Sequence, residues 1–145
     1  MTKRVLTVGH CSADHSAIRQ MLEHHFDVQV ARAHTHDEAL ETLHNQEFDL
    51  VLVNRVFDAD NSDGLELIKM MRADPQLSRI PMMLITNYHD YQQTALAAGA
   101  AEGFGKAELN SPSTIEKLAP YLGDHEQAAQ GAERAAQRPV DRQSD

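Results

Sequence analysis

The sequence predicts an α/β fold, a doubly wound sheet of five parallel strands with helices on both faces. Short apolar segments alternate five times with segments of helical periodicity, which is typical of a parallel sheet. The apolar segments show little alternation, as expected for strands that helices cover on both sides. Asn54 and Thr86 stand directly at the ends of two such segments. This is the edge at which open α/β sheets bind their ligands.

The five expected strands are short segments with apolar residues, and most of them end at a polar residue. In chain order they are Arg4–His10, Asp27–Ala33, Leu50–Asn54, Ile80–Asn87 and Gly103–Lys106. Pro81 is tolerable because it lies at the beginning of its strand, where its missing N–H matters least.

The five expected helices are marked by apolar spacing and by capping residues. They are Ala13–His25, a helix that begins at the capping box Thr35–Glu38, a helix from Gly64 to Asp74-Pro75, Tyr88–Ala98, and a helix that begins at Ser111-Pro112. In the capping box, the threonine and the glutamate are expected to satisfy reciprocal backbone donors. Pro120 lies inside the last helix and predicts a kink or an early end.

Composition limits the class of protein. The chain has 145 residues, 41% of them apolar, a formal charge of −9 and one cysteine. We expect one domain over residues 1–123 and a polar, disordered tail over residues 124–145, which has almost no large apolar side chains. The acidic charge argues against nucleic acid as a partner. The chain has no apolar run near the roughly 18 residues of a membrane span and no signal-peptide pattern, so we expect a cytoplasmic protein without a membrane partner.

Several motifs resemble one known family. A strand ends at Gly9-His10, "DGLELI" follows Asn54, "MLIT" ends at Thr86, and "AGAAEGFGK" ends at Lys106. This order and spacing resemble the CheY-like receiver domain of bacterial two-component response regulators. The resemblance covers about residues 3–123 and implies the five-stranded (βα)5 flavodoxin-like receiver fold.

The resemblance also implies a site, and the sequence departs from it. In the family, two acids after the first strand and an aspartate at the end of the third hold Mg²⁺, and that aspartate accepts a phosphoryl group. Gly9 and His10 occupy the positions of the acid pair, and Asn54 occupies the phosphoacceptor position. Thr86 and Lys106 match the residues that contact the phosphoryl oxygens. Since Mg²⁺ prefers carboxylate ligands, we expect its binding to be lost or weak, no other cofactor, and no catalytic residue.

Two further departures concern the fifth strand and the loop that follows it. The family places a cis proline after the lysine, but here the residue is Ala107. A cis bond before a non-proline residue costs about 3–4 kcal/mol, so we expect a trans bond and a re-routed loop. The aromatic switch residue of the family falls at Gly103, with Phe104 beside it.

The sequence therefore favours an atypical, stand-alone pseudo-receiver in phosphorelay signalling. It would be a phosphorylation-independent protein-interaction module and not an enzyme. The resemblance implies a signalling protein as partner, bound by the fourth helix, fifth strand and fifth helix, and a homodimer stays open. Tyr88 and Tyr91 fit either partner anchors or ordinary surface packing.

The alternative is a sensor of a small anion or ligand in the former phosphorylation pocket. Its candidate residues are His10, Asn54, Arg55 and Lys106. Against this, Lys106 can instead form a structural ion pair with Asp58, Asp60 or Asp63.

Other motifs predict no site. The acidic segment Asp58–Asp63 lacks the spacing of a calcium loop. Cys11 next to His10 fits a small packed residue better than a nucleophile. The nine histidines are scattered and indicate no metal.

Overall fold

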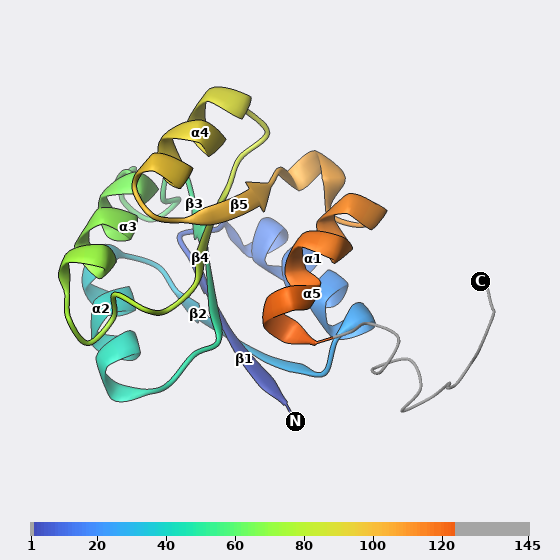
Figure 1. The fold of residues 1–145 in the computed structure, drawn as a ribbon, viewed down its shortest axis with the longest axis horizontal. Coiled ribbons are helices and arrows are strands. Elements are labelled where there is room, and N and C mark those ends of the chain that lie inside the picture. Colours follow the sequence, from blue (N-terminus) through green and yellow to red (C-terminus); the bar gives the residue numbers. More distant parts are fainter. Residues whose placement is uncertain (1, 124–145) are drawn as a thin grey trace.

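The computed structural model describes residues 2–123 and has one sheet of five parallel strands in the order β2-β1-β3-β4-β5 (Figure 1). The strands are β1 (Lys3–Val8), β2 (Val28–Ala33), β3 (Leu50–Asn54), β4 (Met82–Ile85) and β5 (Ala101–Phe104). The sheet confirms the predicted doubly wound α/β class. The predicted tail, residues 124–145, lies outside the described residues.

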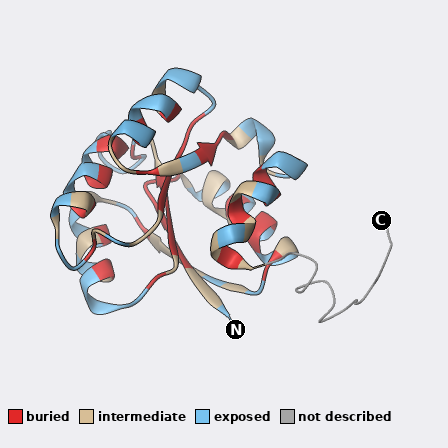
Figure 2. Ribbon diagram, viewed as in Figure 1, coloured by how far each residue is buried: buried red, intermediate tan, exposed pale blue. Residues whose placement is uncertain are grey.

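Five α-helices cover the sheet. They are α1 (Ser12–His25), α2 (His36–Asn45), α3 (Gly64–Ala73), α4 (His89–Ala97) and α5 (Pro112–Leu122), and a short 3-10 helix, η1, spans Lys106–Glu108. Helices α1 and α5 lie on one face of the sheet, and α2, α3 and α4 lie on the other (Figure 1). The central strands β3 and β4 are buried along almost their whole length, whereas β2 at the edge of the sheet is mostly only partly buried (Figure 2).

Each face of the sheet has its own hydrophobic core. Successive side chains of a strand point to opposite faces, so neighbouring residues of β3 serve different cores. Val51 and Val53 pack towards α2 and α3, whereas Leu50 and Leu52 pack towards α1 and α5. All four are fully buried. Burying one such side chain stabilises the fold by about 1.5–3 kcal/mol.

Side-chain caps fix where the helices begin. Thr35 accepts a hydrogen bond from the backbone N–H of Glu38 at 3.1 Å, as the capping box predicts. The glutamate, however, does not return the bond to Thr35. Its carboxylate accepts the backbone N–H of His34 at 2.6 Å instead. Asp63 caps α3 by accepting the N–H of Leu65 at 3.0 Å.

The predicted position of the fifth strand is wrong by two residues. We expected Gly103–Lys106, but β5 spans Ala101–Phe104 and Lys106 begins η1. The strand follows the turn at Gly99, whose φ of +107° ends α4 and starts the strand early. Pro120 also predicted a kink or an early end of α5. The early end is wrong, because the helix continues to Leu122.

A side chain replaces one hydrogen bond of the ladder between β4 and β5. Met83 pairs with Ala101 and Ile85 pairs with Phe104, so β5 carries one extra residue between these pairs. Gln92 of α4 fills the interruption. Its Nε2 donates to the carbonyl oxygen of Leu84 at 2.9 Å, and its Oε1 accepts the N–H of Gly103 at 2.9 Å. Gln92 thereby fixes α4 to both strands.

We predict that Gln92→Leu lowers the free energy of unfolding by about 2–4 kcal/mol, because it leaves the buried Leu84 carbonyl and Gly103 N–H without partners. Urea denaturation of the wild type and the variant measures the loss. The control is Gln93→Leu, which changes the exposed neighbouring glutamine and should stay within about 0.5 kcal/mol. Equal effects of the two substitutions would contradict the bridging role of Gln92.

Candidate functional site

The carboxyl edge of the sheet brings the predicted site residues together. Val8 pairs with Val53, so Gly9 follows β1 beside Asn54, the last residue of β3. Asn54 in turn pairs with Ile85, and Thr86 follows directly. Lys106 begins η1 two residues after the end of β5. This edge corresponds to the ligand-binding edge of open α/β sheets.

The Asn54 side chain uses both ends of its amide. Its Nδ2 donates to the carbonyl oxygen of Gly9 at 3.1 Å and to that of Val56 at 2.7 Å. Its Oδ1 accepts the backbone N–H of Arg55 at 3.1 Å. An ionised carboxylate has no donor and could not make the two bonds to carbonyl oxygens. The surrounding backbone therefore provides two acceptors and one donor that together match an amide.

An aromatic ring occupies the space beside Gly9. Phe57 is fully buried, and a Cβ at position 9 would lie 2.2 Å from its Cδ1. Gly9 also has a φ of +83°, a backbone conformation that side chains with a Cβ rarely adopt. The backbone N–H of Asp58 donates to the carbonyl oxygen of Gly9 at 2.9 Å. No side chain fits at position 9 while Phe57 stays in place.

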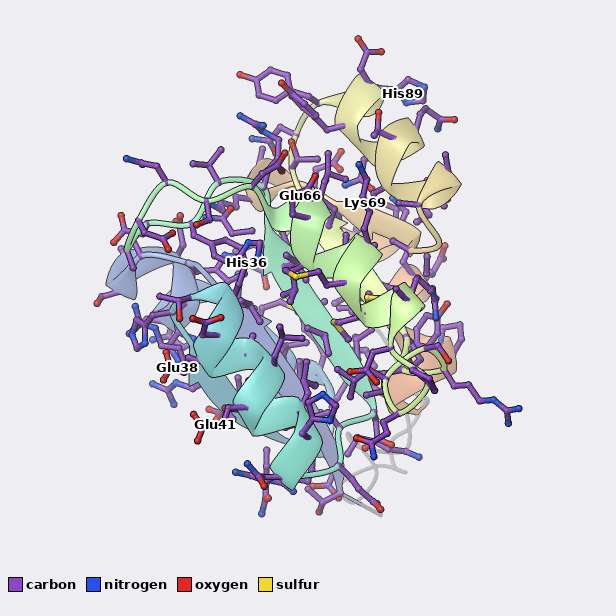
Figure 3. The ribbon with its side chains drawn as sticks, turned by 90° about the vertical axis from the view of Figure 1, so that its left-hand side faces the viewer. His36, Glu38, Glu41, Glu66, Lys69 and His89 are labelled. Atoms are coloured by element: carbon purple, nitrogen blue, oxygen red, sulfur yellow. The ribbon has the colours of Figure 1, made fainter. Side chains whose placement is uncertain are left out.

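The loop between β3 and α3 is closed by its own contacts. Val56 and Asp63 form an antiparallel bridge, and the N–H of Phe57 donates to the carbonyl oxygen of Ser62 at 2.8 Å. His36, at the start of α2, lies against this loop (Figure 3). Its ring centroid is 4.8 Å from that of Phe57, and its Nε2 is 3.1 Å from the carbonyl oxygen of Asp63.

His10 is a buried, neutral imidazole. It is 2% exposed, and its Nε2 lies 3.3 Å from the carbonyl oxygen of Leu52. Its Nδ1 has no hydrogen-bond partner among the described residues. Burial is the main cause that lowers the pKa of His10 to about 4. The hydrogen bond to Leu52 raises the pKa, and the charge of Lys106 lowers it further. His10 therefore carries no charge at neutral pH.

Lys106 forms an ion pair that the sequence did not predict. Its Nζ lies 2.7 Å from Oδ2 of Asp14, in the first turn of α1. The expected pairing with an acid of the segment Asp58–Asp63 is wrong. The hydrogen bond from Lys106 lowers the pKa of Asp14. Asp14 is the functional residue that sequence reasoning missed, and its only signal is an acid shortly after the first strand.

Three of the four candidate anion-site residues meet at one cavity. It has a volume of about 240 Å³ and is lined by Asn54, Arg55, Thr86 and Lys106 together with four neighbours. The guanidinium carbon of Arg55 lies 4.1 Å from the ring centroid of Tyr91, a cation–π contact. His10 does not line this cavity. Thr86 is nearly buried, and its Oγ1 accepts the N–H of Tyr88 at 3.2 Å.

The side chains at this edge do not supply the ligands that Mg²⁺ prefers. The ion takes carboxylates, phosphate oxygens and water, whereas the edge presents an amide at Asn54, a buried imidazole at His10 and an ammonium at Lys106. The Asp14 carboxylate is already paired with the ammonium. Over residues 2–123, no three histidines, cysteines or acids are grouped as metal ligands, which includes the acidic segment Asp58–Asp63.

The loop after β5 has no cis peptide bond and is held by a hydrogen bond to Asn87. No described peptide bond is cis, so the bond before Ala107 is trans, as predicted. The N–H of Ala107 donates to Oδ1 of Asn87 at 3.1 Å, which anchors η1 to the end of β4. Phe104 is buried in the core under α1 and α5. At Gly103 a Cβ would lie 2.2 Å from the carbonyl oxygen of Leu84, so the aromatic position of the family cannot hold a ring here.

Comparison with known proteins gives the family. The response regulator receiver domain model matches residues 6–116. The chain therefore belongs to the response regulator receiver family, whose members are signalling modules of two-component systems. Among curated relatives, the polar-differentiation response regulator DivK of Brucella ovis is 26% identical over 125 residues, which is 86% of this chain and 99% of DivK.

Solved structures share the fold. The chemotaxis response regulator CheY4 of Vibrio cholerae superposes with a TM-score of 0.67 at 20% identity, over 84% of this chain and all of CheY4. The signal receiver domain of a DNA-binding response regulator from Colwellia psychrerythraea gives 0.68 at 22% identity, over 81% and 98%. The helices of residues 2–123 include none with the length and apolar character of a membrane span.

We predict that Gly9→Ala lowers the free energy of unfolding by about 2 kcal/mol or more beyond the cost of its positive φ, because the new Cβ meets the Phe57 ring. The matched control is Gly123→Ala, where φ is +96° and no atom lies within 4 Å of an added Cβ. Chemical denaturation of both variants measures the difference. Equal losses would show that Phe57 yields and that the space beside Gly9 is not filled.

We predict that His10 makes the protein less stable as the pH falls from 6.5 to 4. The unfolded chain binds a proton at this imidazole near its ordinary pKa of 6.5, and the folded chain binds it only near the lowered pKa of about 4. Stability therefore falls through this window, by about 3 kcal/mol.

His10→Gln should remove this dependence because a glutamine side chain does not titrate. Its amide can still donate a hydrogen bond to the Leu52 carbonyl oxygen, so the contact is kept. Denaturation at pH values across the window compares the two proteins, and His89→Gln, which removes an exposed imidazole, is the control. Parallel pH profiles for the wild type and His10→Gln would refute the assignment to His10.

Proposed function

We propose that this chain is a phosphorylation-independent receiver that acts as a protein-interaction module in two-component signalling. The observation that carries the proposal is the bonding of Asn54. Its amide occupies the strand-end position of the phosphoacceptor and donates to the carbonyl oxygens of Gly9 and Val56. An amide is a far weaker nucleophile than a carboxylate, so the position has no group suited to accept a phosphoryl group.

The neighbouring residues support the same proposal. The family's acid pair would have to start at position 9, where the Phe57 ring leaves no room for a Cβ. Lys106 keeps a carboxylate partner, but this partner is Asp14 from the first turn of α1. The lysine therefore has a carboxylate partner within the chain and does not depend on Mg²⁺ or on a phosphoryl group for one.

The proposed output is a contact with another signalling protein through the α4–β5–α5 face. A groove of about 290 Å³ lies on this face and is lined by His89 and Gln93 of α4, Glu102 of β5 and Lys117 of α5. Gln92 ties α4 to both β4 and β5 beneath it. These bonds restrain α4 relative to β5, which supports a module that binds without a switching step.

A second candidate function is the sensing of a small anion. It is favoured by the cavity that Arg55 and Lys106 share, because none of its described lining residues is acidic and Arg55 has no carboxylate partner, although Lys106 is paired with Asp14. Inorganic phosphate and sulfate are suitable probes, added to the isotope-labelled protein without Mg²⁺. Chemical-shift changes confined to the cavity, with an effect on the α4–β5–α5 face, would favour the sensor over the fixed module.

We predict that Asn54→Asp does not restore phosphorylation. The new carboxylate would face the carbonyl oxygens of Gly9 and Val56 and would still lack the other Mg²⁺ ligands. Incubation with acetyl phosphate and Mg²⁺, followed by intact-mass measurement, should show no phosphorylated species. Robust labelling of the variant would falsify the proposal that the pocket has lost its chemistry.

The same substitution should lower the free energy of unfolding by about 1–3 kcal/mol at neutral pH. The loss should shrink in acid, because a protonated carboxyl group can donate one of the two lost hydrogen bonds. Asn110→Asp is the matched control, since it makes the same change at an exposed turn. A destabilisation of equal size at both positions would count against the special role of Asn54.

A further inference from the structure

The cavity beside Asn54 has an exposed aromatic rim. Tyr88 is 67% exposed and is the most exposed large apolar or aromatic side chain of the described residues. Its ring meets the ring of Tyr91 edge-on, with centroids 6.1 Å apart. Val56 stands at the same cavity and is 37% exposed. Exposed tyrosines that pack on a second aromatic ring lose little conformational freedom on binding and are enriched at interface centres.

The guanidinium of Arg55 has N–H donors available for a ligand. Its guanidinium lies over the Tyr91 ring at 4.1 Å, and this contact fixes the side chain. Among residues 2–123, no carboxylate pairs with the guanidinium and no acceptor takes a hydrogen bond from it. The N–H donors in the plane of a guanidinium match a carboxylate in a two-bond arrangement. Arg55 is thus a fixed cation without an acidic partner.

The charge of this cavity is opposite to that of the chain. Arg55 and Lys106 line it, and its other described lining residues are uncharged. The chain as a whole has a formal charge of −9. The outer surface of α2 and α3 shows this acidic character, with exposed carboxylates at Glu38, Glu41 and Glu66 (Figure 3). Since Lys106 is paired with Asp14, Arg55 is the cation of this cavity without a carboxylate partner, and charge complementarity favours an acidic group there. The net charge of −9 on each chain disfavours a second copy of this chain.

We propose that the cavity and its rim form a docking site for a protein segment with a carboxylate side chain next to an apolar one. The carboxylate binds the guanidinium of Arg55, beside the Lys106–Asp14 ion pair, and the apolar side chain packs on Val56 and Tyr88. A free inorganic anion would use the cations but would leave Tyr88 and Val56 uncovered. The inference rests on the proposed function as an interaction module and adds the chemistry of the partner.

The first experiment selects ligands from a phage-displayed library of short random peptides against the full chain. We expect enriched peptides to share an aspartate or glutamate adjacent to a leucine, isoleucine, valine or phenylalanine. The best peptide is then synthesised, with a second version in which the acid is replaced by its amide. The amide version should bind about tenfold more weakly or worse, since it loses the charge-assisted hydrogen bonds.

Variants of the chain locate the binding site. Tyr88→Ala should weaken the peptide about thirtyfold, as expected for a central aromatic anchor. Arg55→Gln should weaken it about tenfold or more, and Arg55→Lys should recover part of that loss because it keeps the charge. Matched controls are Met70→Ala, at an exposed apolar residue of α3, and Arg79→Gln, at an exposed arginine. Both controls should stay within about twofold of the wild type.

Each alternative outcome overturns the proposal in its own way. A consensus without an acid, or binding unaffected by Tyr88→Ala and Arg55→Gln, rejects this docking site. Dimerisation that depends on Tyr88 in sedimentation experiments assigns the surface to a second copy. Shifts at the cavity with inorganic phosphate, combined with no selected peptide, assign it to a free anion.

These outcomes are separate from failure of the proposed function. Mass-spectrometric labelling of the wild type by acetyl phosphate would reject phosphorylation independence whether or not a peptide binds. Conversely, a partner that binds only the α4–β5–α5 groove would reject the docking site and leave the interaction module intact. His89→Ala and Gln93→Ala, on that groove, distinguish the two surfaces.

Discussion

The amide of Asn54 holds together the edge of the sheet on which the site is built. It bonds to the end of β1 through Gly9 and to the following loop through Val56. These bonds bring the loop back over the sheet, where Asp58 also donates to the Gly9 carbonyl and Phe57 enters the core. The ring then fills the space that a side chain at position 9 would need. One amide thus organises the loop that lies over this edge of the sheet.

The fold could be predicted because its signals are local and repeated. Apolar runs, capping residues and the prolines near helix ends placed four strands and the helices to within a few residues. Strand β5 was misplaced because Gly103 and Gly105 weaken its pattern and because its ladder is completed by the side chain of Gln92. No periodicity in a sequence reports a hydrogen bond made by a side chain of another element.

The site was less predictable for the same reason. Asn54, Thr86 and Lys106 follow strands, and strand ends meet at one edge. Asp14 reaches Lys106 only because the first turn of α1 lies across that edge. Phe57 directly precedes the acidic segment Asp58–Asp63 and was not singled out from the sequence, and its burial depends on the absence of a side chain at Gly9. His10 was expected at the anion site, but its imidazole turns to the carbonyl of Leu52 and is buried.

The packing of Phe57 against Gly9 also determines what an acidic pocket at this edge would require. An acid at position 9 meets the ring, and an aspartate at position 54 faces two carbonyl oxygens. Removing the ring first opens a cavity in the core, at a cost of about 3–5 kcal/mol. Each of these single substitutions is therefore destabilising, and most domains have only about 5–15 kcal/mol in total. An acidic pocket in this chain would require several substitutions together, which is strong epistasis.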